Sequence, residues 1–297
     1  MTYSIVARDS TTGELGVAVQ SHWFSVGQMC PYAEAGVGAV ATQAWVEPAY
    51  GPRLLGLLRS GMTPSEALAG LVTADAGRDQ RQVAVVDATG AVAAHTGAAC
   101  IAACGHRTGD GVSVQGNMLL RDEVWSSMLG AYEVAAAEGL GLAERLLAAL
   151  DEAEANGGDA RGRQSAALLV VGGSLTVDVR VDDHELPLVE LRRLVGMQQA
   201  SRILVQAQAD ILGDDVPGAL ALFAEVQERY GANMEPSFWA GALLAGLDRP
   251  DDAAPFLRAA ASSNPGWVDL LRRLPPSGAV PLTDVQVMSA LGVAGLG

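Results

Sequence analysis

The fold of this chain is decided by its beginning, residues 2–20, which read TYSIVARDSTTGELGVAVQ. Two short runs with the composition of strands flank the turn-forming residues Ser10–Gly13, and this pattern predicts a β-hairpin. The ends of most chains fray because few contacts hold them. A hairpin that starts at residue 2 predicts instead a terminus that is tied into a sheet.

Thr2 follows the initiator Met1 directly. Removal of Met1 would place a hydroxyl and a free α-amine on one residue. This pair supplies both the nucleophile and the base of N-terminal threonine catalysis. The central hypothesis from the sequence is therefore that Thr2 forms an active site once Met1 has been removed.

The composition is typical of a globular protein with one or two domains. The chain has 297 residues, of which 49% are apolar and 18% are charged, so it can bury a large core. Its formal net charge of −15 argues against nucleic acid and anionic membranes as partners. All 19 basic residues are arginines. The absence of lysine excludes Schiff-base chemistry and any lysine that tunes a nucleophile.

The cysteine and histidine content gives no sign of a metal or cofactor site. Cys30, Cys100 and Cys104 accompany only four histidines, and no second cysteine pair completes a zinc pattern. We therefore expect no metal and no cofactor. The odd cysteine count predicts a cytoplasmic protein, as does the absence of a basic and apolar leader and of an apolar run of membrane-spanning length.

Blocks of strands alternate with pairs of helices up to about residue 183. After the hairpin we expect a loop over 21–31 and strands over 35–43, 82–87, 91–96, 112–117, 166–171 and 175–181. Helices are expected over 48–60, 63–72, 122–137 and 142–155, and a glycine-rich loop is expected to end at 105–109. Thr63 and Glu66 predict a capping box, with Pro64 in the first turn. The order predicts a layered α+β fold and argues against a Rossmann fold.

Residues 187–297 predict a separate helical domain. Residues 219–223 resemble residues 253–257 at an offset of 34 residues, which is the spacing of a tetratricopeptide-type (TPR-like) repeat. We therefore divide the chain into an N-terminal domain, 1–186, and a helical domain, 187–297. The helical domain is expected to hold repeat-like hairpins over about 199–274 and a last helix over 283–291.

These stretches resemble a family of N-terminal-nucleophile (Ntn) hydrolase-like proteins known as domain of unknown function 1028 (DUF1028). The resemblance covers residues 1–183 and rests on residues 2–9, 36–43, 81–87, 95–97, 105–106, 115–117 and 158–169. It implies a four-layer αββα sandwich, which agrees with the element order. Some relatives carry a helical tail assigned to peptidoglycan binding, and residues 199–291 resemble that tail. The resemblance supplies no substrate.

The expected mechanism starts with attack of the Thr2 hydroxyl on an amide carbonyl, while the α-amine takes the proton directly or through a water. Asn117 and Gln43 are the predicted oxyanion donors, because each uncharged amide stands at the end of an expected strand. Arg8 or Arg81 would supply the electrostatic field that a lysine provides near the nucleophile in proteasome-type enzymes.

The predicted substrate-binding residues are Ser4, Ser21, His22, Arg81, His95, Arg161 and Arg163. Ser4 shares a sheet face with Thr2 by strand alternation. Ser21 and His22 end the second strand, near residue 2 across the hairpin. The alternative role of His22 is to orient its neighbours in the loop.

Arg161 and Arg163 stand in a glycine-flanked loop, where a pair of guanidinium groups could bind a substrate carboxylate bidentately. The alternative is a solvated loop. His95 lies in an expected strand, and its alternative is a structural histidine with satisfied hydrogen bonds.

The sequence thus predicts an Ntn-type amidohydrolase that cleaves a small amide or peptide-like molecule. The alternative is a catalytically silent Ntn-fold binding or assembly protein whose helical tail mediates protein contacts. Cell-wall binding through the tail is a third hypothesis. A homo-oligomer, dimeric or larger, is expected because such folds pair through their layers and short repeat arrays need their exposed faces covered.

Overall fold

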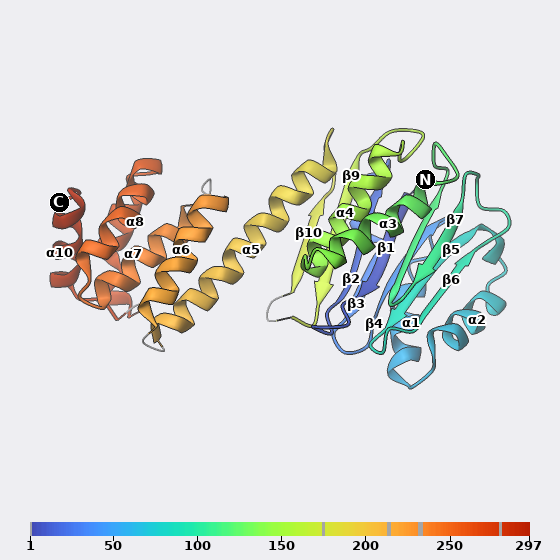
Figure 1. Cartoon of the computed structure of the whole chain (residues 1–297), viewed down its shortest axis with the longest axis horizontal. Coiled ribbons are helices and arrows are strands. Elements are labelled where there is room, and N and C mark those ends of the chain that lie inside the picture. Colours follow the sequence, from blue (N-terminus) through green and yellow to red (C-terminus); the bar gives the residue numbers. More distant parts are fainter. Residues whose placement is uncertain (1, 174–175, 213–214, 231–233, 279–280) are drawn as a thin grey trace. The chain divides into compact units, whose positions relative to one another are not determined.

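The hairpin expected at the start of the chain forms the centre of the larger of two antiparallel sheets (Figure 1). The computed structural model describes residues 2–173, 176–212, 215–230, 234–278 and 281–297. The larger sheet has the strand order β10-β9-β2-β1-β8-β7. Its strands are β1 (Thr2–Arg8), β2 (Leu15–Ser21), β7 (Gly105–Gly109), β8 (Val112–Asn117), β9 (Ser165–Val171) and β10 (Val177–Val181).

The smaller sheet has the order β3-β4-β5-β6. Its strands are β3 (Pro31–Glu34), β4 (Gly38–Ala44), β5 (Arg81–Asp87) and β6 (Val92–Thr96). The expected mixed α+β fold with antiparallel sheets and a helical C-terminal region is confirmed.

Asp9 closes the hairpin between β1 and β2. Its carboxylate accepts hydrogen bonds from two backbone N–H groups of the turn (2.8 and 3.3 Å), and its own N–H donates to the Glu14 carbonyl (2.9 Å). Gly13 has a φ of +76°, a left-handed conformation that glycine adopts without a steric cost from a Cβ. The resulting register pairs Thr2 with Ser21. The turn at one end of the hairpin therefore fixes which residues meet at the other end.

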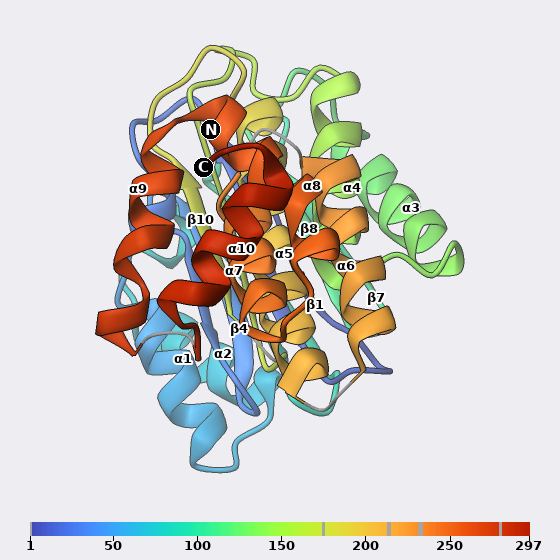
Figure 2. The ribbon, with the colours of Figure 1, turned by 90° about the vertical axis from the view of Figure 1, so that its left-hand side faces the viewer.

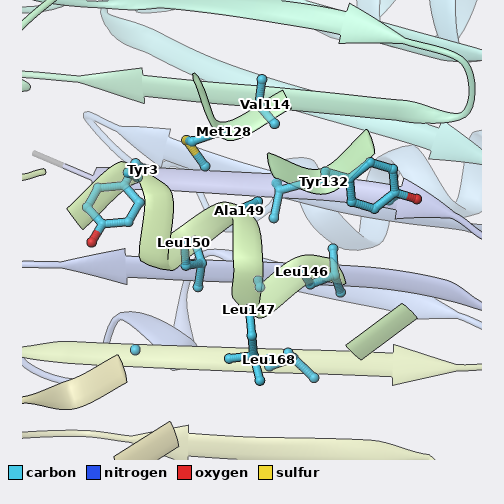
Figure 3. Close-up of a cluster of buried hydrophobic side chains, with 14 of the residues drawn as sticks. Tyr3, Val114, Met128, Tyr132, Leu146, Leu147, Ala149, Leu150 and Leu168 are labelled. Carbon is cyan, nitrogen blue, oxygen red and sulfur yellow. The ribbon is translucent and has the colours of Figure 1, made fainter. Parts of the chain in front are cut away.

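Alternation along the strands gives the larger sheet two different faces. Tyr3 and Ile5 of β1 pack with helices α3 (Val124–Ala137) and α4 (Leu142–Ala155) in one buried cluster, part of which is drawn in Figure 3. Val6 of β1 belongs to a second cluster, which joins β2 and β9 to β4 and β5 of the smaller sheet. This second cluster fills the space between the sheets, and we call it the inter-sheet layer.

Two helices, α1 (Tyr50–Arg59) and α2 (Pro64–Ala74), cover the other face of the smaller sheet through a third apolar cluster. The predicted capping box at the start of α2 is present. The Thr63 hydroxyl accepts a hydrogen bond from the Glu66 N–H (3.3 Å), and the Glu66 carboxylate accepts one from the Thr63 N–H (2.9 Å).

Two expectations for the N-terminal part differ from the structure, and one lies outside the described residues. Residues 21–31 are not all loop, because a 3₁₀ turn occupies Val26–Gln28 and β3 begins at Pro31. Residues 105–109 form β7 and do not end a loop, because their backbone pairs with β8 despite two glycines. The predicted start of the last strand at Leu175 lies outside the described residues. Another 3₁₀ turn, Arg78–Gln80, precedes β5.

The chain divides into two compact units, Met1–Val195 and Gly196–Gly297. The helices after β10 are α5 (Pro187–Leu212), α6 (Val216–Tyr230), α7 (Glu235–Gly246), α8 (Pro250–Ser263), α9 (Gly266–Arg273), the 3₁₀ turn Pro275–Ser277 and α10 (Asp284–Ala294). In the second unit, edge-to-face rings of Phe223 and Phe256, with centroids 5.7 Å apart, join α6 to α8. Figure 2 shows these C-terminal helices in orange to red. The repeat-like segments lie on α6 and α8, and a TPR-like identity stays a prediction.

Among the described residues, no helix combines the length and the apolar character that crossing a membrane requires.

Candidate functional site

The candidate site lies at the end of the larger sheet where β1 begins. Thr2 pairs with Ser21 of β2 on one side and with Asn117 of β8 on the other. The hydroxyl oxygens of Thr2 and Ser21 are 3.1 Å apart, and Thr2 is only 7% exposed. Thr2 and Val6 are four residues apart on β1, so their side chains lie on the same face of the strand. Because Val6 packs in the inter-sheet layer, the side chain of Thr2 faces the smaller sheet. Met1, whose removal the sequence hypothesis requires, lies outside the described residues.

Three buried amide side chains lie beside Thr2, and we call them the amide cluster: Gln43 of β4, Gln82 of β5 and Asn117 of β8. The side-chain oxygen of Gln82 accepts hydrogen bonds from the amides of Gln43 (2.8 Å) and Asn117 (2.9 Å). Both of these amides also donate to the backbone carbonyl of Thr2, at 3.3 and 3.5 Å. The Gln82 amide nitrogen lies 2.8–3.0 Å from two carbonyls and a hydroxyl on β6, β7 and β8, so its two hydrogens are shared among three acceptors. The cluster therefore ties the two sheets together at Thr2.

The hydrogen bonds of this cluster bear on the predicted oxyanion donors. An amide nitrogen has two hydrogens, and the amides of Gln43 and Asn117 each make two hydrogen bonds, one to Thr2 and one to Gln82. An oxyanion would have to displace one of these partners. In the geometry described here, both amides hold the Thr2 backbone, and their action on an oxyanion stays a prediction.

A pocket of about 250 Å³ opens beside Thr2. The described residues that line it are Thr2, Ser21, Trp23, Val26, Met29, Cys30, Thr42, Gln43, Ala44, Trp45, Val46 and Arg161. Hydroxyl and amide groups therefore meet apolar and aromatic walls, and among these residues Arg161 alone carries a charge. Such a mixture, mostly apolar with a few polar groups, is typical of small-molecule sites.

The wall at Trp45 is built on a strained residue. Ala44 has a φ of +68°, a left-handed conformation that costs on the order of 1–2 kcal/mol for a residue with a Cβ. Two hydrogen bonds hold the backbone of the next residue, Trp45. The Trp45 N–H donates to the Gln80 carbonyl (3.1 Å), and the Trp45 carbonyl accepts from the Arg81 guanidinium (2.5 Å). Arg81 thus positions the pocket wall from outside and does not itself line the pocket.

Asp159 organises the loop that carries Arg161. Its carboxylate is fully buried and pairs with the Arg161 guanidinium (3.3 Å). It also accepts hydrogen bonds from the backbone N–H groups of His22 and Arg161, both at 2.9 Å. The Nδ1 atom of His22 is buried and has no hydrogen-bond partner within the described part of the chain. Asp159 therefore fixes Arg161 and the end of β2 together at one side of the pocket.

Other predicted substrate-binding residues have partners away from the pocket. Ser4 is fully buried, and its hydroxyl accepts a hydrogen bond from Gln115 (2.6 Å). His95 contacts the Arg78 carbonyl through Nε2 (2.8 Å). The structure thus separates these two residues from the lining described above, to which Ser21 and Arg161 belong.

The two arginines of the same loop also differ in their surroundings. Arg163 pairs with Glu154 (3.0 Å), whose carboxylate also accepts a hydrogen bond from the Tyr3 hydroxyl (2.7 Å). This places Arg163 on the α4 side of the sheet. Arg8, the alternative source of an electrostatic field, lies at the opposite end of β1 from Thr2.

Several groups near the site have shifted pKa values. Burial raises the pKa of the Cys30 thiol to about 12, so this pocket residue is a neutral thiol at neutral pH. The hydrogen bond from Arg81 is the main reason that the pKa of Asp75 is lowered to about 2. Burial, with the nearby Asp75 carboxylate, raises the pKa of Tyr50 to about 12. Burial and nearby His95 lower the pKa of His106, which keeps that imidazole neutral.

Within the described residues, no group of three or more His, Cys, Asp or Glu side chains has the geometry to hold a metal ion.

Comparison with known proteins places this chain in a family. Residues 2–191 match the model of a family that is described as a family of unknown function (DUF1028). The chain belongs to the DUF1028 family. It is similar to the crystal structure of protein SPO2555 from Silicibacter pomeroyi, also a DUF1028 protein, with 34% sequence identity and a TM-score of 0.62. The similarity covers 67% of this chain and 86% of that chain. No match was found among curated proteins.

The sequence predictions did not include four residues whose contacts at the site are described above: Gln82, Asp159, Trp23 and Trp45. Gln82 was detectable, because it lies two residues from Ala84 and therefore places a polar side chain on the same buried face of an apolar strand. The two tryptophans stand in segments with no clear periodicity. Asp159 gave no signal, since an aspartate in a glycine-rich loop is usually a turn residue.

Proposed function

We propose that this DUF1028 protein is an amidohydrolase that uses Thr2, exposed by removal of Met1, to cleave a small amide or peptide-like molecule. The observation that carries the proposal is the Thr2 hydroxyl, which lines a pocket and lies 3.1 Å from the Ser21 hydroxyl. A reactive threonine needs a pocket for the amide and a neighbouring group that can pass a proton, and both are present at this position.

The proposal includes the four-layer αββα arrangement of Ntn hydrolases for the N-terminal unit. Two features support it: an apolar layer joins the two sheets, and each sheet packs a pair of helices on its other face. In this arrangement the first residue of a central strand lies between the sheets. Thr2 occupies that position in β1.

In the proposed reaction, the Thr2 Oγ forms a bond to the amide carbonyl carbon, and its proton passes to the neutral α-amine. The resulting oxyanion collapses, the C–N bond breaks, and the leaving amine takes the proton from the α-ammonium. Water then attacks the Thr2 ester, the α-amine accepts the proton of the water, and Thr2 Oγ leaves and is reprotonated. A free α-amine has a pKa of about 7.7–8.0, so activity should rise as the pH increases through this range.

The amide cluster supports this chemistry by positioning. Two side-chain amides hold the Thr2 carbonyl, and the same residue carries both the hydroxyl and the α-amine. A fixed backbone at Thr2 reduces the entropy that is lost when nucleophile and base align with a substrate. Trp45, Ser21 and Arg161 then surround the space in front of the hydroxyl.

The test is the state of the N-terminus in the full-length protein as it is produced in cells. Intact mass and N-terminal peptide sequencing are expected to show complete removal of Met1. A β-lactone, which acylates N-terminal threonine, is expected to modify the Thr2 peptide at a single site. Quantitative retention of Met1, or β-lactone labelling elsewhere with an unmodified Thr2, would contradict the proposal.

A catalytically silent binding protein is the second candidate, and one observation favours it. The amides predicted as oxyanion donors are both engaged with Thr2 and Gln82. A protein that only binds its ligand has no oxyanion to stabilise. Retained Met1 together with ligand binding in the pocket would establish this alternative.

A further inference from the structure

The pocket beside Thr2 has two aromatic side chains at its mouth. Trp23 and Trp45 both line the pocket, yet they are 55% and 72% exposed. Large aromatic side chains are normally buried, because their exposure to water is unfavourable. A pair of exposed rings at one opening therefore offers two surfaces on which another ring can stack.

The backbones behind both rings are anchored. The Trp23 carbonyl accepts a hydrogen bond from the Ser165 hydroxyl at the start of β9. The backbone of Trp45 is held at its N–H by Gln80 and at its carbonyl by Arg81. On a fixed backbone the freedom of each ring is limited to its two side-chain torsions, so less conformational entropy is lost when a planar ligand stacks on it.

Arg161 adds a charge to this aromatic opening. It is the charged residue among the described lining residues, and the Asp159 carboxylate accepts hydrogen bonds from its backbone N–H and from its guanidinium. Arginine binds carboxylates through a planar, multidentate set of N–H groups. Because Asp159 pairs with this guanidinium and the chain carries a net charge of −15, an anionic group would be recognised here through direct hydrogen bonds to Arg161 and not through a positive field of the pocket.

We infer that the pocket selects an N-acylated amino acid or a very short peptide with an aromatic side chain and a free carboxylate. The ring stacks on Trp23 and Trp45, the carboxylate binds Arg161, and the amide lies at Thr2. The volume of about 250 Å³ supports a small ligand, since it lies just below the range of roughly 300–1,000 Å³ that is usual for small-molecule sites. Turnover of this ligand rests on the proposed function, whereas its binding does not.

The test measures binding without turnover, by isothermal titration of the full chain carrying Thr2→Ala. Three probes separate the two recognition elements: N-acetylphenylalanine, N-acetylalanine, which lacks the ring, and N-acetylphenylalaninamide, which lacks the carboxylate. N-acetylphenylalanine is expected to bind about tenfold more tightly than either of the others, because each loses one stacking or charged contact.

Matched variants assign each preference to its residue. Trp45→Ala or Trp23→Ala should remove most of the preference for the ring. Phe24→Ala should leave it unchanged, because Phe24 is 62% exposed but is not among the lining residues. Circular dichroism melting of each variant checks that it remains folded.

Arginine variants test the carboxylate in the same way. Arg161→Gln should abolish the preference for N-acetylphenylalanine over its amide, and Arg161→Lys, which keeps the charge beside Asp159, should retain part of it. Arg163→Gln is the control from the same loop, because Arg163 pairs with Glu154 outside the described lining.

The inference is overturned if N-acetylphenylalanine shows no binding, if the three probes bind equally, or if Phe24→Ala and Arg163→Gln are as damaging as their counterparts. It is also overturned if tryptophan replacement changes the oligomeric mass but not probe affinity, since the rings would then form a protein interface. If the preferences hold but the wild-type protein does not hydrolyse N-acetylphenylalanine, the ligand class stands and the hydrolase proposal fails. If the wild-type protein hydrolyses amides but shows neither preference, the hydrolase proposal stands and the ligand class fails.

Discussion

The inter-sheet layer has an apolar part and a polar end, and four strands contribute to both. β1 changes from Val6 to Thr2, β2 from Val19 to Ser21, β4 from Ala41 to Gln43 and β5 from Ala84 to Gln82. Each change occurs on the inward face, and each occurs at the end of the layer where β1 begins. A packed core needs only apolar side chains, and buried polar groups are costly unless they are hydrogen-bonded. The polar end meets this condition through the hydrogen bonds of Thr2 and the amide cluster.

The largest effect is expected in the apolar part. Val19→Asp places a carboxylate at a fully buried position among apolar neighbours. We expect a loss of about 5 kcal/mol in the free energy of unfolding, or failure to fold, because the charge has no partner there. Chemical denaturation measures this loss. The control is Val189→Asp at a position that is 65% exposed. An equal loss there would show that burial among apolar side chains is not the cause of the effect at Val19.

At the polar end, Thr2→Ala should affect activity far more than stability. We expect kcat/KM for a hydrolysed amide to fall by about 1,000-fold or more, which corresponds to about 4 kcal/mol. The melting temperature should change little, because one hydroxyl contact with Ser21 is lost. Thr2→Ser retains a nucleophile and should keep measurable activity. Full activity of the alanine variant would show that Thr2 is not the nucleophile.

The amide cluster tests whether the polar end is a connected network. Gln82→Leu leaves the amides of Gln43 and Asn117 without one acceptor each, and we expect a loss of about 3 kcal/mol in unfolding free energy. The double variant with Gln43→Leu should lose less than the sum of the two single variants, since residues of one network are coupled. Additive losses in urea denaturation would mean that the two residues act independently.

The smallest effect is expected at the ion pair outside the pocket wall. The Arg81 hydrogen bond is the main cause of the lowered pKa of Asp75, about 2, which is below the unfolded value of about 3.9. The pair therefore stabilises the folded state above about pH 4, and this stabilisation disappears as the pH falls towards 2. Asp75→Asn should cost about 1 kcal/mol at pH 7, a modest value because an asparagine oxygen can still accept the hydrogen bond from the Gly77 N–H.

Unfolding curves from pH 7 to pH 2 measure this difference. The curves of the wild-type protein and the Asp75→Asn variant should converge near pH 2. A gap that is constant with pH would mean that ionisation of Asp75 contributes nothing to stability.

Much of the fold was predictable because it depends on local patterns. The hairpin of β1 and β2 follows from two apolar runs around a turn, and the start of α2 follows from its capping box. β7 was missed because Gly105 and Gly109 indicate a loop, whereas pairing with β8 makes the segment a strand. Propensity is a weak guide where backbone pairing with a distant segment decides the structure.

The site was predictable only in part. The hairpin register brings Thr2 to Ser21, and this could be inferred from the turn. The amide cluster joins three strands from two sheets, so Gln82 could not be placed beside Thr2 without the packing of the sheets. Arg161 and Arg163 are two residues apart in one loop, and the sequence does not indicate which of them lines the pocket.

The place of β1 at the centre of its sheet sets a time limit during synthesis. β1 is translated first, but its sheet closes only when β8 and β9, which end at Asn117 and Val171, have been made. At roughly 5–20 residues per second, this takes on the order of 10–30 s. Thr2 is 7% exposed once the sheet is complete, so the proposed cleavage of the bond before Thr2 is expected to occur on the nascent chain, within this interval. The proposed nucleophile therefore requires N-terminal processing that is faster than completion of the sheet.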